Sequence, residues 1–197
     1  MKRLSLGACI LAVLLVAFNV YADTPLAAVQ ANVNKVLDVL RDPAMKAETA
    51  KEVKKEKLRA IYEKMFDEIE LAKRTLARNW NALDVAQRRE FVQLFRQVLE
   101  KAYIDKILSY TNEKVVFDKE TVLADNQAEV QTRIITASKE IPIFYRVIQK
   151  DGTWKVYDVI VEGVSLVQNY RTQFSEILAK NSPKELLEIL RKKVNES

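Results

Sequence analysis

The chain of 197 residues has no histidine at all and little cysteine or glycine. Without histidine it lacks both the commonest general base and the commonest metal ligand of proteins. Of its three glycines only Gly152 and Gly163 lie beyond the N-terminal leader, so a glycine-rich phosphate-binding loop cannot be built. The single cysteine, Cys9, also lies in that leader. We therefore expect a mature protein without metal, cofactor or disulfide, which packing alone must stabilise.

Residues 1–22 have the pattern of a cleaved secretory signal peptide. A short basic start precedes an almost wholly apolar run from Leu4 to Val20, and the small residue Ala22 stands before Asp23. The alternative, a membrane anchor, needs about 20 apolar residues. We expect cleavage after Ala22, a periplasmic location, and a mature chain over residues 23–197 that folds as a single domain.

The size and charge of the mature chain are typical of an ordinary globular domain, since domains commonly have about 100–200 residues. Beyond the leader, 30 basic residues stand against 27 acidic ones. Mixed charge of this size favours a solvated surface over a nucleic-acid-binding patch.

Residues 24–107 predict helices, because their apolar side chains recur at helical spacing. Asp84 and Gln87 form a capping box that opens the longest of these helices, whose apolar stripe is wide and rich in large side chains. We interpret the charged segment 46–57 as a solvated helix face, with partner docking as the alternative. The expected helical stretches are residues 24–42, 46–80 and 84–107.

Residues 115–161 predict strands, because apolar and polar side chains alternate there. Asp151-Gly152 between alternating runs is the strongest short-range signal for a hairpin. Ser165 with Gln168 and Ser182 with Glu185 then begin two more helices. The expected strands are residues 115–117, 128–136, 141–149 and 154–161. This order predicts an α+β fold, with a helical layer on one face of a mainly antiparallel four-stranded sheet.

A two-residue turn at Asp151 and Gly152 fixes the register of the hairpin when its residues are counted outward. Tyr145 then lies opposite Asp158, and Ile143 lies opposite Ile160. We assign the more apolar face of this hairpin to the interior. Its side chains are Ile143, Tyr145, Val147, Trp154, Val156, Asp158 and Ile160.

Several motifs of the chain resemble those of the MlaC family, also called toluene-tolerance Ttg2-type proteins. The motifs are Trp80, Gln87-Arg88, Phe91, Phe95 and Ala102-Tyr103, then Tyr145-Arg146, Trp154 to Asp158, and Glu162-Gly163-Val164-Ser165-Leu166. The match covers nearly all of residues 23–180 and includes the exported leader. The chain departs from the pattern at Ala77, where many relatives have glycine in Leu-Gly-x-x-Trp. We expect this difference to tighten the helix before Trp80.

The resemblance implies an NTF2-like fold with an apolar lipid cavity between helices and sheet. It also implies a periplasmic phospholipid carrier, which encloses the acyl chains of glycerophospholipid, shuttles it between the outer and inner membranes and so maintains outer-membrane lipid asymmetry. The implied partners are an inner-membrane MlaFEDB-type ABC transporter and an outer-membrane MlaA-type lipoprotein with a porin. We expect a monomer and no enzymatic activity.

The hydrophobic free energy of a lipid tail determines how much apolar contact a carrier must provide. Each methylene withdrawn from water is worth about 0.8 kcal/mol, so two chains of roughly sixteen carbons need on the order of 20 kcal/mol or more of apolar contact. We expect that contact between the sheet face and the opposing helix stripe, with plain core packing as the alternative for any one residue. The candidate lipid-binding residues are Leu99, Tyr103, Ile107, Val130, Ile134, Ile143, Tyr145, Val147, Trp154, Val156, Ile160, Val164 and Leu166, with Arg146 and Arg171 as candidates for the head group.

Two other classes of protein stay open at this point. A small-molecule enzyme of NTF2-like fold would use Asp158 as a general base beside Tyr145, because an apolar pocket can raise the pKa of an aspartate. Alternatively, Asp158 only accepts hydrogen bonds from Tyr145 or nearby amides and fixes the end of its strand. A pair of acids of glycosidase type is conceivable, but no spacing singles one out. A periplasmic chaperone is also compatible with a basic, helical protein.

Overall fold

The computed structural model describes residues 24–110 and 112–196, so the predicted leader lies outside the described residues. The helices are α1 (Pro25–Arg41), α2 (Lys51–Met65), α3 (Glu68–Leu76), α4 (Val85–Leu108), α5 (Leu166–Leu178) and α6 (Pro183–Asn195). The strands are β1 (Lys114–Ala124), β2 (Gln127–Ile135), β3 (Glu140–Lys150), β4 (Thr153–Val161) and β5 (Val164–Ser165). Within the described part of the chain, no helix has the length and apolarity needed to cross a membrane.

The helices begin where polar side chains satisfy their first backbone amides. Thr24 caps α1, and its hydroxyl accepts a hydrogen bond from the amide of Ala27 at 3.1 Å. The predicted capping box of Asp84 and Gln87 is confirmed at the start of α4, with distances of 2.8 and 3.0 Å. Ser182 and Glu185 form a second complete box at α6. These are local signals, which explains why the sequence located these helices.

The five strands form one antiparallel sheet in the order β1-β2-β3-β4-β5. The α+β prediction is confirmed, although the sheet has a fifth strand. Two tight turns of the same kind make the last two connections. Asp151 and Gly152 turn β3 into β4 with φ values of 49° and 74°, and Glu162 and Gly163 turn β4 into β5 with φ values of 49° and 84°. Both turns need positive φ at two successive residues, and glycine adopts this angle freely.

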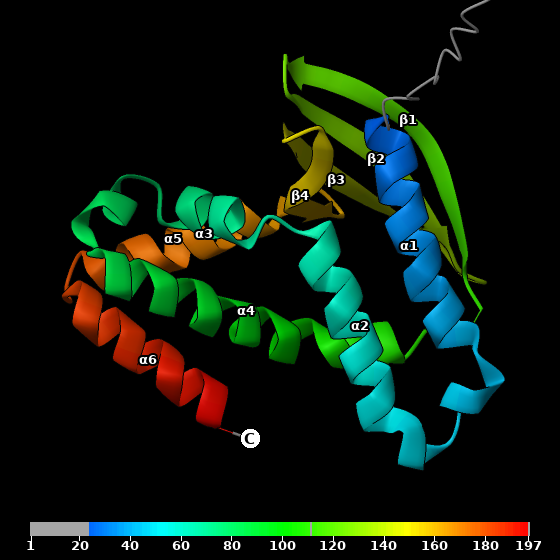
Figure 1. Ribbon diagram of the computed structural model, residues 1–197, viewed down its shortest axis with the longest axis horizontal. Coiled ribbons are helices and arrows are strands. Elements are labelled where there is room, and N and C mark those ends of the chain that lie inside the picture. The colour runs from blue at the N-terminus through cyan, green and yellow to red at the C-terminus, as the bar shows by residue number, and fades with distance from the viewer. Residues whose placement is uncertain (1–23, 111, 197) are drawn as a thin grey trace, which may run out of the picture.

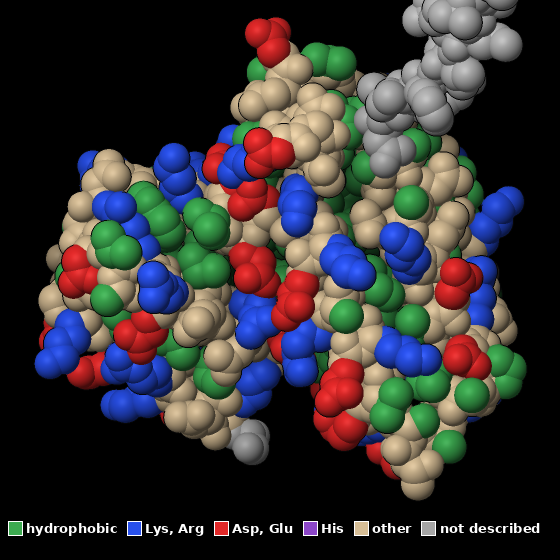
Figure 2. Space-filling model, in the orientation of Figure 1, with side chains coloured by type: hydrophobic (Ala, Val, Ile, Leu, Met, Phe, Trp, Pro, Cys, Tyr) green, Lys and Arg blue, Asp and Glu red, His purple; other side chains and the backbone are tan. Residues whose placement is uncertain are grey.

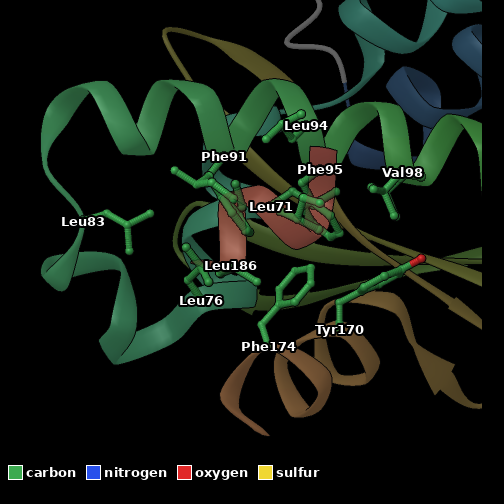
Figure 3. Packing of buried hydrophobic residues seen from close by; sticks show 14 of the residues in the cluster. Leu71, Leu76, Leu83, Phe91, Leu94, Phe95, Val98, Tyr170, Phe174 and Leu186 are labelled. Carbon is green, nitrogen blue, oxygen red and sulfur yellow. The ribbon is translucent and has the colours of Figure 1, made fainter. Parts of the chain in front are cut away.

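Two apolar clusters hold the fold together, and the helices and strands that form them can be located in Figure 1. The helical cluster is made by α3, α4, α5 and α6, with Phe91, Phe95 and Phe174 at its centre (Figure 3). The ring centroids of Phe95 and Phe174 lie 5.3 Å apart in an edge-to-face arrangement. The sheet cluster is made by α1, the end of α2 and one face of β2, β3 and β4. Phe66 packs against both clusters and is the point at which they meet.

A bulge in β4 changes which side chains share a face. The predicted register holds from Lys150 opposite Thr153 to Val147 opposite Val156, but then shifts by one residue. Arg146 therefore lies opposite Asp158, and Tyr145 lies opposite Val159. The prediction that Tyr145 faces Asp158 and Ile143 faces Ile160 is wrong, because one extra residue on β4 turns its later side chains to the other face.

Part of the other face of β4 is shielded from solvent, since α3 and α5 both contact this strand. The guanidinium of Arg74 on α3 stacks on the ring of Tyr157, 3.9 Å from the ring centroid. Tyr157 in turn donates a hydrogen bond to Gln127 on β2 at 3.1 Å. Helices thus reach both faces of the sheet, where the sequence predicted one helical layer.

Ala77 adopts a backbone conformation that explains the glycine expected at this position. It has φ 50° and ψ −125°, and its amide closes α3 by bonding to the carbonyl of Lys73. Residues 77–82 then form a 3₁₀ helix up to Leu83. The helix before Trp80 is therefore interrupted at Ala77, and the effect expected from the loss of the glycine stays a prediction.

Candidate functional site

The candidate site is built on the apolar face of β2, β3 and β4 that points toward α1. Val130 has no exposed surface, and Val147 and Val156 are buried beside it. Cross-strand pairing brings them together, since Val130 pairs with Tyr145 and Val147 pairs with Val156. Val29 and Val33 of α1 cover this end of the face. The predicted grouping of these strand residues on one face is correct up to the bulge.

The same face becomes less buried toward the end of the sheet that begins β3. Ile134 of β2 and Ile143 of β3 are half-buried, as is Tyr145. Burial nevertheless raises the pKa of Tyr145 to about 12, so its phenol is neutral at any physiological pH. Trp154, at the opposite end of the face, packs against the sheet cluster. The sheet therefore offers a largely apolar surface, interrupted by Thr132, which is buried at Val130, Val147 and Val156 and half-buried at both ends.

Three candidates from the helices belong to the helical cluster instead. Leu99 is buried in it, and Tyr103 and Leu166 pack against it. Burial raises the pKa of Tyr103, and the ammonium of Lys106 lies 5.6 Å from the centre of its ring. The apolar stripe of α4 packs mainly on other helices, whereas the sequence analysis placed it opposite the sheet. The two clusters share Phe66, which packs against both.

Three further candidates lie away from the apolar face. Ile107 is 40% exposed near the end of α4, and Val164 is 61% exposed in β5. Ile160 is buried, but the bulge places it opposite Phe144 on the other face of the sheet. The predicted position of Ile160 on the same face as Val156 is wrong, and lipid contact of all three residues stays a prediction. The run from Trp154 to Ile160 carries a signal that the count passed over, since Asp158 interrupts the apolar side of the alternation and Val159 and Ile160 are adjacent apolar residues.

The two arginines proposed for the head group are both engaged by the protein. Nε of Arg146 donates to Glu129 at 3.2 Å, and its Nη1 lies 3.9 Å from the carboxylate of Asp158. Arg171 donates through Nε and Nη2 to the carbonyl of Arg74 at 3.0 and 2.7 Å, which ties α5 to the last turn of α3. Contact with a head group stays a prediction for both, and Arg171 has a clear structural role.

Asp158 holds the start of α5 and does not meet Tyr145. It is 2% exposed, and its carboxylate accepts hydrogen bonds from the hydroxyl of Ser165 at 2.6 Å and the amide of Val167 at 3.0 Å. Ser165 Oγ accepts from the amide of Gln168 at 3.0 Å, so Asp158 buttresses the helix cap. Tyr145 lies on the opposite face of the sheet. The general-base arrangement proposed for an enzyme is therefore not formed.

Phe66 is the functional candidate that the sequence analysis did not single out. It follows α2, stacks on Tyr62 with 4.4 Å between ring centroids, and forms a bridge with Val156. The amide of Asp67 then donates to the carbonyl of Val156 at 2.9 Å. Apolar spacing counted Phe66 as one more helical position. The signal that was available is Asp67, whose side chain caps α3 and so marks a break in the helix.

Two hollows lie between α2 and α4, and no residue of the apolar face lines either of them. Their volumes are about 290 and 300 Å³, and charged side chains of α2 and α4 line much of both. Among the described residues, no group of histidine, cysteine, aspartate or glutamate has the arrangement of a metal site.

Comparison with known proteins gives consistent results. A family model described as "MlaC protein" matches residues 30–192. The "Intermembrane phospholipid transport system binding protein MlaC" of Haemophilus influenzae is 30% identical over 112 residues, which are 54% of this chain and 52% of that protein. The "Toluene tolerance protein ttg2D" of Pseudomonas putida is 26% identical over 96 residues, 48% and 45% of the two chains. The chain thus aligns with about half the length of each of these curated relatives.

A solved structure has the same fold. It is the phospholipid-binding protein from Ralstonia solanacearum in complex with a phospholipid. The TM-score is 0.79, the sequence identity is 21%, and the match covers 87% of this chain and 97% of that one. At this identity the likeness establishes the fold.

Proposed function

The chain belongs to the MlaC family, and from this membership we propose that it is a carrier of glycerophospholipid. The match of the family model over residues 30–192 carries this proposal. The carrier works in the periplasm, encloses the acyl chains of one lipid and shuttles between the outer and inner membranes, which maintains outer-membrane lipid asymmetry. It acts as a monomer without catalysis. Its partners are an inner-membrane MlaFEDB-type ABC transporter and an outer-membrane MlaA-type lipoprotein with a porin.

The apolar face of the sheet supports this function because it has the surface that acyl chains require. Two chains of roughly sixteen carbons lose on the order of 20 kcal/mol when they leave a bilayer for water, at about 0.8 kcal/mol per methylene. Charged contacts near a protein surface contribute only a few kcal/mol, so an apolar surface must supply the rest. The face from Ile134 to Val156 offers such a surface on the sheet.

We place the acyl chains along this face, with entry from its half-buried end at Ile134 and Ile143. Tyr145 lies farther in, and Val130, Val147, Val156 and Trp154 form the deep end. Leu99, Tyr103 and Leu166 supply the helical side of the slot. In this arrangement a tail displaces contacts between the two clusters at Phe66, because that residue now packs against both.

Lipid mass spectrometry of the purified protein tests this proposal. We expect stoichiometric phospholipid after extraction from the wild-type protein. Ile143→Glu should lose most of it, since a carboxylate then stands in the path of the tails and must be desolvated. Val122→Glu is the matched control, because Val122 is 73% exposed at the far end of β1, and this variant should keep its lipid. A wild-type protein that carries no lipid and extracts none from phospholipid vesicles would contradict the function itself.

A further inference from the structure

Helices α2 and α4 are separated by a groove. The two helices run antiparallel, because Glu63 contacts Arg96 while Arg59, one turn earlier on α2, contacts Glu100, one turn later on α4. The two hollows described above follow each other along the same pair of helices. Figure 2 shows the molecule hollowed between the lobe that carries α4 and α6 and the part that carries α2. We call this feature the α2–α4 groove.

Positive charge prevails on the walls of the α2–α4 groove. Six cations line it, Lys46, Lys51, Lys54, Lys55, Arg59 and Lys101, against three acids. Lys46 and Lys54 have no ion-pair partner among the residues that the structure describes. Lys51 and Lys55 are paired only with glutamates three residues before them, in pairs that face solvent and hold little energy. Most of these cations are therefore available to an anionic partner.

The floor and rim of the groove together define what fits it. Ile104, Leu108 and Val194 give it an apolar floor of half-buried side chains. Arg59 shows how the rim binds a carboxylate, since its Nε and Nη2 both donate to Glu100. Such two-pronged contacts are the strong form of carboxylate recognition. An elongated groove between two helices admits a peptide segment with one apolar face, whereas a flat bilayer surface cannot enter it.

We propose that the α2–α4 groove is the docking site for an acidic, amphipathic segment of a partner protein. Glutamates or aspartates of that segment pair with Lys46, Lys54 and their neighbours, and its apolar side chains cover Ile104 and Leu108. The inference goes beyond the carrier function and stands independently of it, because the groove is distinct from the apolar face of the sheet.

Binding of a synthetic peptide tests this site. The probe is an amphipathic helical peptide with glutamate on one face and leucine on the other, and the control peptide has glutamine in place of glutamate. Amide shifts in the isotopically labelled protein report the binding surface, and fluorescence anisotropy gives the affinity. The site variant is Lys46→Glu with Lys54→Glu. The matched control is Lys180→Glu with Lys184→Glu, which changes the net charge equally at two exposed positions outside the groove.

The expected shifts gather on α2 and the C-terminal half of α4. The site variant should weaken binding about tenfold or more, while the control variant should change it by less than about twofold, because like charges in contact oppose docking far more than distant ones. Thermal melting of both variants verifies that they fold. The proposal fails if the acidic peptide does not bind, if the glutamine peptide binds equally, or if both variants weaken binding alike. It also fails if vesicles of phosphatidylglycerol bind through these lysines while the peptide does not.

Discussion

Replacing Ala77 by glycine should stabilise the protein, although this exchange usually has the opposite effect. The φ of 50° and ψ of −125° at Ala77 lie in a backbone region that glycine adopts without strain but that is sterically disfavoured for a residue with a Cβ atom. Holding any other residue in such a region costs about 1–3 kcal/mol. Glycine removes that cost, but it also lowers the free energy of unfolding by about 0.4–1 kcal/mol, because it increases the conformational entropy of the unfolded chain. Because Ala77 is exposed, the lost methyl group leaves no cavity.

The expected net gain is about 0.5–2 kcal/mol in the free energy of unfolding. For a domain of this size it corresponds to an increase in Tm of about 2–4 °C per kcal/mol. Urea unfolding followed by circular dichroism measures it directly. The matched control is Ala60→Gly, at an exposed position inside α2, which should lose about 1 kcal/mol. If both variants lose stability to the same extent, Ala77 is not strained and the reasoning is refuted.

Two further predictions concern buried carboxylates. Asp158→Asn should lower the free energy of unfolding by about 1.5–3 kcal/mol, because it weakens the charge-assisted hydrogen bonds to Ser165 and Val167. Phospholipid binding by this variant should be unchanged. Loss of lipid from a folded variant would instead place Asp158 in contact with the ligand. Burial raises the pKa of the Glu68 carboxyl group above its ordinary value of 4.5. The protonated carboxyl group therefore stabilises the fold fully below pH 4.5, and this stabilisation is lost as the pH rises through the pKa of the folded state. Glu68→Gln should therefore raise Tm at neutral pH and leave it unchanged in acid. A lower Tm at neutral pH would show that pairing with Arg96, at 3.8 Å, outweighs burial.

The sequence predicted those features that a few adjacent residues determine. The capping boxes at Asp84 and Ser182 and the Asp151-Gly152 turn each depend on contacts within four residues, and the structure contains all three. The box expected at Ser165 is only half formed, because the side chain of Gln168 accepts from Arg171 instead. A competing contact within the first turns of the same helix therefore replaces the second bond of the box.

Features that depend on distant segments could not be predicted in the same way. The bulge turns the side chain of Asp158 toward α5, where its carboxylate accepts hydrogen bonds from the hydroxyl of Ser165 and the amide of Val167. Both residues lie beyond the turn that follows β4. The stripe on α4 was correctly identified as apolar, but its spacing does not say whether a sheet or other helices cover it. The helical candidates therefore pack in the helical cluster, whereas those from Val130 to Val156 share one face of the sheet, and lipid contact stays a prediction for both groups.

The division into two apolar clusters has a consequence for the order in which the protein can mature. As the chain emerges from the ribosome, the sheet cluster has all of its buried members once Val156 of β4 is out. The helical cluster has to wait for Leu186, Leu187 and Leu190 of α6. Until then α5 already packs on the aromatic rings of α4, but the surface of α4 that α6 covers is exposed, which makes this interval the moment of greatest exposure to proteases and to self-association. A chain that lacks α6 would therefore contain all the buried members of the sheet cluster but only part of the helical cluster.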